Sequence, residues 1–221
     1  ISNHPELVRR LGCIAMNGLI DESGAPRMGV SGPIARTARD AALLFDSVHP
    51  PSGPGTVGSS VEAVARAGEL RGLRIGVSLA SPFEGWADIR FSDDALAALD
   101  AGIAALEAAG HAVEPAEFAY DPRYPDIFTT VWTAALARIP FAPGAEEGLG
   151  PLARMFLERA RATAAGQLAE AVGAMHAFAA DATAQWGAYD AVLTPALAFA
   201  PPQVGAFQAL GPEGDYRLQC E

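Results

Sequence analysis

The sequence contains one glycine-serine stretch in which a nucleophilic serine could lie, Gly58-Ser59-Ser60. A serine nucleophile at a strained strand-to-helix turn needs glycine on both sides, so that the turn can expose the hydroxyl. Here Val61 follows the two serines instead. A serine just before a helical run more often accepts hydrogen bonds from the first free backbone N–H groups of the helix. We therefore predict that Ser59 or Ser60 caps a short helix over residues 61–68, and we identify no catalytic residue here.

Side chains that ligate metals or transfer protons are present but scattered. They are His4, His49, His111, His176, Cys13, Cys220 and the pair Glu146-Glu147. No two histidines have the spacing of a zinc site, and no Cys-x-x-Cys occurs. The two glutamates lie in a glycine-containing loop, where nothing apolar would make one of them an acid and the other a base. The sequence implies no metal site and no cofactor.

Lysine is absent from the chain, and all 15 of its Lys and Arg residues are arginines. Average composition predicts on the order of ten lysines at this length. A GC-rich coding sequence, in which alanine and arginine replace lysine, accounts for the difference. Whatever the cause, the chain alone supplies no phosphate-binding lysine, no Schiff base and no Ser–Lys catalytic pair.

Aromatic side chains gather on a helical stretch that follows a proline-containing turn and carries Ile127, Phe128 and Trp132. Such a stripe most often belongs to a core, and the alternative is the wall of an apolar pocket. Phe128, Trp132 and Thr194 are the candidate substrate-binding residues on this second interpretation. The connection over residues 79–91 is long, and long connections more often carry function.

The composition narrows the class of protein. Half of the 221 residues are hydrophobic, which suits a single α/β domain over residues 1–221 or two small domains. The net charge of −11 opposes binding to nucleic acid or to an anionic membrane surface. No apolar run approaches the ~18–20 residues of a membrane span. Two distant cysteines without a disulfide framework favour the reducing cytoplasm.

Two strands and a helix form the clearest unit of the sequence. Residues 73–78 and 111–117 have the apolar character of buried strands. Between them, Ser92 begins an amphipathic helix and Gly110 ends it. A strand–helix–strand unit of this length pairs its two strands in parallel.

Helical periodicity then dominates residues 123–187, which contain three helical stretches and no strand. Residues 189–195 return to a short strand, and Thr37 begins an earlier helix. Residues 1–29 are expected to be mostly irregular, and no regular element is assigned to residues 196–221. The expected fold is α/β, with a mixed, largely parallel sheet flanked by helices and a helical insertion at about 123–187.

Four segments carry motifs in a fixed order along the chain. They are Gly32-Pro33-Ile34-Ala35-Arg36-Thr37-Ala38-Arg39-Asp40 with the alanine- and leucine-rich run to Asp46, Gly72-Leu73-Arg74-Ile75-Gly76-Val77, the 95–110 helix leading into His111-Ala112-Val113, and Tyr189-Asp190-Ala191-Val192-Leu193-Thr194-Pro195. Together, over roughly residues 30–205, they resemble the amidase signature hydrolases. The resemblance implies hydrolysis of carboxylic amide bonds, a small-molecule amide substrate and no cofactor. Trp132 resembles the tryptophan of amidases that act on small or aromatic amides and linear oligoamides.

The catalytic residues of that family have no counterpart here. The resemblance implies a serine nucleophile, a second serine in a cis peptide and a lysine base, all of which precede the motif matched at residues 32–46. We therefore expect these groups to lie outside the 221 residues. The chain would then supply scaffold and pocket walls, and by itself it would be inactive.

Two further hypotheses remain. One is a non-catalytic α/β binding module, or a degenerate amidase homologue, that uses residues 79–91 and 123–138 to hold an apolar ligand. The other is a structural or regulatory protein that pairs with another chain. Apolar faces left uncovered would make the isolated chain associate with itself, which leaves a homo-oligomer open.

Overall fold

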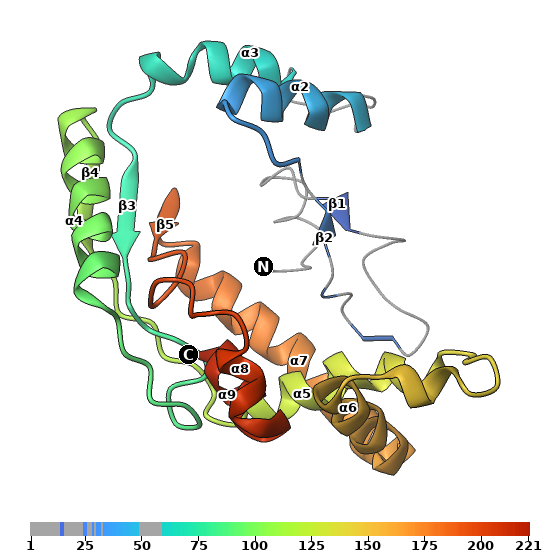
Figure 1. The fold of residues 1–221 in the computed structure, drawn as a ribbon. Coiled ribbons are helices and arrows are strands. Elements are labelled where there is room, and N and C mark those ends of the chain that lie inside the picture. The colour runs from blue at the N-terminus through green and yellow to red at the C-terminus, as the bar shows by residue number, and fades with distance from the viewer. Residues whose placement is uncertain (1–13, 16–23, 26–27, 29, 32, 49–58) are drawn as a thin grey trace.

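Helices predominate in the computed structural model, which describes residues 14–15, 24–25, 28, 30–31, 33–48 and 59–221 (Figure 1). Within these residues a parallel three-stranded sheet has helices on its flanks, and a separate two-stranded pair is antiparallel. The expected α/β class with a largely parallel sheet is therefore confirmed.

The three-stranded sheet is built around β3 (Arg74–Val77). Strand β4 (Ala112–Pro115) pairs with one edge of β3, and β5 (Ala191–Leu193) pairs with the other, both in parallel. The central strand thus joins two segments that are far apart in the sequence. The residues at the carboxyl ends of β3 and β5 consequently lie at the same edge of the sheet.

Helix α4 (Asp93–Ala108) connects β3 to β4, as the strand–helix–strand pattern predicts. The Ser92 hydroxyl accepts a hydrogen bond from the Ala95 N–H at 3.3 Å and caps the helix. Gly110 ends it with a φ of 85°, a conformation that costs glycine little because glycine has no Cβ. A Cβ at Gly102 of α4 would lie 3.7 Å from Leu193 of β5, so α4 covers the face of the sheet that carries Leu193.

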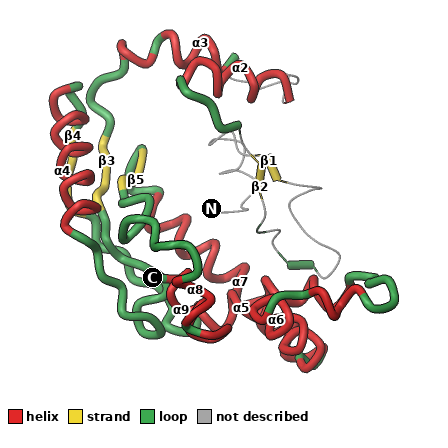
Figure 2. The backbone as a smooth tube through the Cα atoms, in the orientation of Figure 1, coloured by secondary structure: helices red, strands yellow, loops and turns green. Residues whose placement is uncertain are grey.

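The helical insertion is confirmed. It consists of α5 (Tyr124–Ala134), the 3₁₀ turns η2 (Ala135–Arg138) and η3 (Ala145–Gly148), α6 (Pro151–Ala162) and α7 (Ala165–Trp186). Figure 2 shows this block of helices below the sheet and to its right. Helices α5 and α7 pack against each other, and their contact contains the buried cluster of Ala25, Ile127, Val131 and Met175. The face of α5 that carries Ile127 and Val131 is therefore buried in this cluster. Only the opposite face of α5 can contribute to a site.

The N-terminal elements lie at the top and the middle right of Figure 1. They are the antiparallel pair β1 (Ile14–Ala15) and β2 (Val30–Ser31), helices α2 (Ala38–Val48) and α3 (Ser60–Ala65), and the turn η1 (Ala67–Glu69). Asp46 of α2 accepts hydrogen bonds from the backbone N–H groups of Ser60 and Val61, at 2.9 and 3.1 Å. Hydrogen bonding from Ser60 holds the pKa of this carboxyl below its ordinary value. Asp46 therefore ties α2 to the N-terminus of α3.

The C-terminal residues form α8 (Ala206–Ala209) and α9 (Gly211–Cys220), to which the sequence analysis assigned no regular element. Pro212 lies in the first turn of α9, where the missing N–H of proline costs nothing. Buried Tyr216 anchors this helix to the helical insertion.

Several large apolar side chains of the described residues are exposed, including Ile34 (97%), Leu43 (58%) and Leu197 (65%). Exposed apolar surface of this kind favours association with other apolar surface. We expect the isolated 221-residue chain to associate with itself at micromolar concentration. Size-exclusion chromatography with light scattering measures this directly. Leu43→Glu should increase the monomer fraction, and a sharp monomer peak for the unaltered chain would contradict the expectation.

Candidate functional site

Phe128 and Trp132 lie one turn apart on α5, and the structure brings their rings together. The ring centroids are 5.6 Å apart and the planes are nearly parallel, at 21°. Phe128 packs partly against the core cluster, whereas Trp132 is 43% exposed. The aromatic stripe therefore serves both as core and as surface, and its Trp132 end is available to a ligand.

Trp132 connects α5 to two other helices. Its ring lies 5.1 Å from Phe156 of α6 and 6.2 Å from Tyr216 of α9, centroid to centroid. Tyr216 also contacts Trp86 of the 79–91 connection, at 5.3 Å. Helices α5, α6 and α9 and the 79–91 connection thus all meet around the Trp132–Tyr216 contact.

Thr194 lies elsewhere, directly after β5 at the carboxyl end of the strand. Its side chain is exposed. The structure does not bring it into the ring contacts of Phe128 and Trp132. None of these three candidates is among the described residues that line the cavity between α5, α6 and α9.

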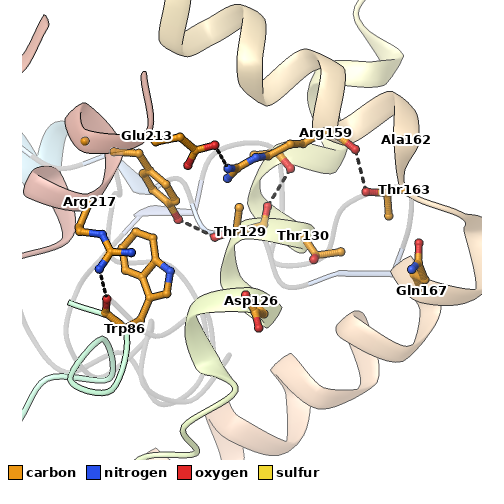
Figure 3. Close-up of a pocket in the computed structure, with 13 residues that line it drawn as sticks. Trp86, Asp126, Thr129, Thr130, Arg159, Ala162, Thr163, Gln167, Glu213 and Arg217 are labelled. Carbon is orange, nitrogen blue, oxygen red and sulfur yellow. Dashed lines mark hydrogen bonds and ion pairs between the residues drawn. The ribbon is translucent and has the colours of Figure 1, made fainter. Parts of the chain in front are cut away.

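A cavity of about 580 Å³ lies between α5, α6 and α9, with Trp86 on one side (Figure 3). Residues 79–91 and α5, the two segments that the binding-module hypothesis singled out, both contribute to it. Most of the residues that line it carry polar or charged side chains. Sequence reasoning had named the neighbouring aromatic residues, and it missed the residues that line the cavity itself.

One face of α5 forms the floor of the cavity and consists of Asp126, Thr129, Thr130 and Thr133. We call this set the α5 polar face. Its members stand at i, i+3, i+4 and i+7, which is the spacing of a single helical face. The pattern was visible in the sequence, but a polar face on a helix is usually just the solvated side, so the spacing alone does not indicate a site.

The hydroxyl groups at the floor have fixed orientations. Thr129 donates to the carbonyl of Pro125 at 2.7 Å, and Thr133 donates to the carbonyl of Thr129 at 2.7 Å. The Tyr216 hydroxyl lies 2.6 Å from the Thr129 oxygen. Because Thr129 has a single hydroxyl hydrogen, which the Pro125 carbonyl takes, Tyr216 is the donor in this pair. The remaining lone pairs of the threonine oxygens are acceptors.

The opposite wall carries charge. Arg159 of α6 donates to the carboxylate of Glu213 of α9, and these two charges neutralise each other. Arg217 of α9 donates to the backbone carbonyl of Trp86 at 2.8 Å, and its guanidinium carbon lies 4.9 Å from the centre of the Trp86 ring. These contacts fix the Arg217 guanidinium in place without neutralising it.

Two phenols, the buried Tyr216 and the half-buried Tyr124, give this region a measurable pH response. Burial raises the pKa of Tyr124 and that of Tyr216 to about 12, above the usual ~10 of tyrosine. Between about pH 10 and about pH 12 the folded chain therefore binds more protons than the unfolded chain. The free energy of unfolding falls as the pH rises through this interval. Absorbance at 295 nm should show late ionisation for these two tyrosines, and burial also raises the pKa of Tyr120. Tyr216→Phe and Tyr124→Phe should each remove part of the late change, and ionisation of all tyrosines together in a folded chain would contradict the prediction.

The other candidate groups have structural roles where they are described. Ser59 accepts a hydrogen bond from the Glu62 N–H at 3.1 Å and caps α3, as predicted. His176 hydrogen-bonds the carbonyl of Gly24 at 3.0 Å. Within the described part of the chain, no cluster of His, Cys, Asp and Glu could hold a metal ion. His4, Cys13 and His49 lie outside the described residues.

No helix in the described ranges is long and apolar enough to cross a membrane.

The family of the chain follows from comparison with known proteins. The family model described as "Amidase" matches residues 10–219, which is nearly the whole sequence. The chain therefore belongs to the amidase family, and the resemblance of its four ordered motifs is confirmed.

Solved structures show the same fold. The structure of a 6-aminohexanoate cyclic dimer hydrolase superposes with a TM-score of 0.66 at 22% sequence identity, covering 87% of this chain and 42% of the hydrolase. The structure of that hydrolase complexed with substrate gives a TM-score of 0.65 at the same identity. The chain thus spans less than half the length of the hydrolase. No curated protein matches the sequence.

Proposed function

We propose that this chain supplies scaffold and pocket walls to an enzyme that hydrolyses carboxylic amide bonds of small molecules in the cytoplasm. The observation that carries the proposal is the match to the amidase family over residues 10–219. The order and spacing of the four sequence motifs support it. On this proposal residues 1–221 form one domain together with a segment that carries the catalytic groups.

The proposed reaction proceeds through an acyl-enzyme. A serine oxygen attacks the amide carbonyl, a lysine takes the serine proton through a second serine, and backbone N–H groups stabilise the oxyanion. The C–N bond then breaks, the amine leaves with the proton that the lysine returns, and water hydrolyses the acyl-enzyme to the carboxylic acid and the free serine. The absence of lysine from the sequence supports a base that lies on another segment. The role of Ser59 as a helix cap supports the same conclusion for the nucleophile.

Phe128, Trp132 and Thr194 are the wall residues of this proposal. The stacked rings of Phe128 and Trp132 offer a flat apolar surface, of which Trp132 is 43% exposed. Such a surface favours substrates with an aromatic ring or a carbon chain beside the amide. Thr194, at the carboxyl end of β5, would offer a hydroxyl. The hydrolase with the same fold is described as acting on a cyclic dimer of 6-aminohexanoate, which is such a carbon-chain amide.

The isolated chain is expected to be inactive. We would assay the purified 221 residues against simple aliphatic and aromatic amides and measure ammonia or amine release. No turnover above that of the heat-denatured chain is expected, since this proposal assigns both the nucleophile and the base to another segment. A protein extended by the coding sequence before Ile1 should hydrolyse these amides, if that sequence encodes a glycine-serine-rich loop preceded by a lysine. Turnover by the isolated chain that survives every control would contradict the assignment of the catalytic groups.

One observation favours the second candidate, a non-catalytic binding module. Residues 79–91 and α5 meet around a cavity of about 580 Å³, and a chain without a nucleophile could use that cavity for binding alone. The gene separates the two hypotheses. A start codon directly before Ile1 would favour the module, whereas an upstream glycine-serine-rich segment would favour the enzyme.

A further inference from the structure

Among the described residues that line the cavity between α5, α6 and α9, one cation, Arg217, forms no ion pair with a carboxylate. Arg217 is held by the Trp86 carbonyl at 2.8 Å and by the Trp86 ring at 4.9 Å. Both contacts leave the guanidinium with its full charge, and among the described residues no carboxylate forms an ion pair with it. A guanidinium has five N–H donors, so the remaining ones stay available. Arg217 is therefore a preformed receptor for an anionic group.

The same cavity contains a free anion on its floor. Asp126 belongs to the α5 polar face and lies in the first turn of α5, where the helix dipole favours a negative charge. Across the described ranges, its carboxylate forms no hydrogen bond and no ion pair. Figure 3 shows Asp126 and Arg217 separated in view by the Trp86 side chain. The two charged groups thus belong to different helices, α5 and α9, and they form no ion pair with each other.

The same cavity also presents hydroxyl groups and aromatic ring surface. Thr129 and Thr133 direct their hydrogens to backbone carbonyls, so their oxygens act only as acceptors. Trp86 and Tyr216 contribute aromatic surface beside them. The remaining charges, Arg159 and Glu213, already form an ion pair. Among the described residues that line the cavity, the charges therefore sum to zero, and one charge of each sign has no ion-pair partner.

We propose that this cavity binds a small zwitterion, whose carboxylate pairs with Arg217 and whose ammonium pairs with Asp126, with a short carbon chain over Trp86 between them. A monoanion would pair with Arg217 but would leave Asp126 without a partner and would face its negative charge. A monocation would pair with Asp126 but would leave Arg217 without a partner and would face its positive charge. Only a ligand with both charges pairs the two free groups at once. The inference rests on the cavity alone and holds whether or not the amide hydrolysis proposed above is correct.

The test is binding to the chain as it exists, measured by isothermal titration calorimetry at about pH 7, where both ends of an ω-amino acid are charged. The probe is 5-aminopentanoate, and the matched probes are pentanoate and pentylamine, which each lack one charge. We expect 5-aminopentanoate to bind roughly tenfold or more tightly than either, because each charged hydrogen bond contributes separately. Binding should weaken as salt is added, since both charges are partly exposed.

Variants assign the two ends of the ligand. Arg217→Gln should weaken 5-aminopentanoate binding roughly tenfold, and Asp126→Asn should abolish the preference for 5-aminopentanoate over pentanoate. As controls, Arg66→Gln removes a positive charge and Asp100→Asn removes a negative charge on the exposed surface outside the cavity. Both control variants should leave binding unchanged. If Arg217→Gln loses its circular dichroism signal, Arg217→Lys replaces it, since lysine keeps the charge but not the planar fork.

Three results would overturn the proposal. The first is no heat of binding for 5-aminopentanoate at concentrations up to about 10 mM. The second is equal affinity for 5-aminopentanoate and either matched probe, which would mean that only one charge is recognised. The third is unchanged binding by the folded Arg217 and Asp126 variants, which would place the ligand elsewhere. None of these results depends on catalysis, so failure here is distinguishable from failure of the proposed amide hydrolysis.

Discussion

Replacing Tyr216 by alanine is expected to lower the free energy of unfolding by about 3–5 kcal/mol, the usual cost of removing a buried aromatic side chain. Tyr216 is only 3% exposed. Its ring contacts Phe156 at 4.9 Å, Trp86 at 5.3 Å and Trp132 at 6.2 Å, so one side chain joins α9 to α5, α6 and the 79–91 connection. Urea denaturation followed by circular dichroism measures the loss.

Tyr216→Phe is the matched control, because it keeps the ring and removes only the hydroxyl. That hydroxyl donates to Thr129, whose oxygen keeps its other hydrogen bond, to the carbonyl of Pro125. The expected loss is about 1 kcal/mol, the net contribution of one such hydrogen bond. An alanine variant as stable as the phenylalanine variant would show that the ring contacts do not hold α9 in place. The same comparison bears on the cavity, since Tyr216 forms part of its wall.

The elements that could be predicted are those whose signals are local. Ser59, Ser92 and Gly110 act within one turn of the helices that they cap or end, and each does so in the structure. The parallel pairing of β3 with β4 also follows from local information, because the connection between them contains a single helix. The position of β5 on the other edge of β3 does not, since residues 78–190 separate the two strands.

Helix α9 is an element that the local sequence does not predict. The pair Gly211-Pro212 is typical of a loop, but here it begins a helix, because proline is tolerated in the first turn of an α-helix. The helix is polar for most of its length, and its one deeply buried aromatic side chain is Tyr216. A helix held by a single aromatic anchor has no apolar stripe to reveal it. Its stability comes from residues of α5 and α6 that no sequence window contains.

For the same reason, only part of the candidate site could be predicted from the sequence. Phe128 and Trp132 stand out because aromatic residues are few and their spacing is helical. The cavity depends on which helices meet, and Arg217 matters only because Trp86, 131 residues away in the chain, lies beneath it. Charges of this kind look like ordinary solvated residues until the tertiary structure shows which of them lack a partner.

Gly76 of β3 is expected to be nearly as sensitive as Tyr216. A Cβ at this position would lie 2.9 Å from the Cβ of Ala116 and 2.9 Å from two ring carbons of Tyr189, closer than real Cβ contacts allow. The Tyr189 ring has little room to move, because Arg74 lies 4.9 Å over it and Phe118 lies against its edge at 6.2 Å. Gly76→Ala should therefore destabilise the chain by about 1–3 kcal/mol through overpacking. The loss is measured by urea denaturation, and rising bulk in Gly76→Val should increase it.

Gly102 of α4 provides the opposite case in the same part of the fold. A Cβ there would lie 3.7 Å from Leu193, an ordinary contact, and alanine is a better helix former than glycine by about 1 kcal/mol. Gly102→Ala should therefore leave the stability unchanged or raise it by up to about 1 kcal/mol. If Gly76→Ala lowers the free energy of unfolding and Gly102→Ala raises it, close packing against Tyr189 explains why Gly76 does not tolerate a side chain. The loss would then not be a general effect of replacing glycine. If Gly76→Ala were as stable as Gly102→Ala, Tyr189 would not be packed against the central strand, and the arrangement of β5 beside β3 would have to be revised.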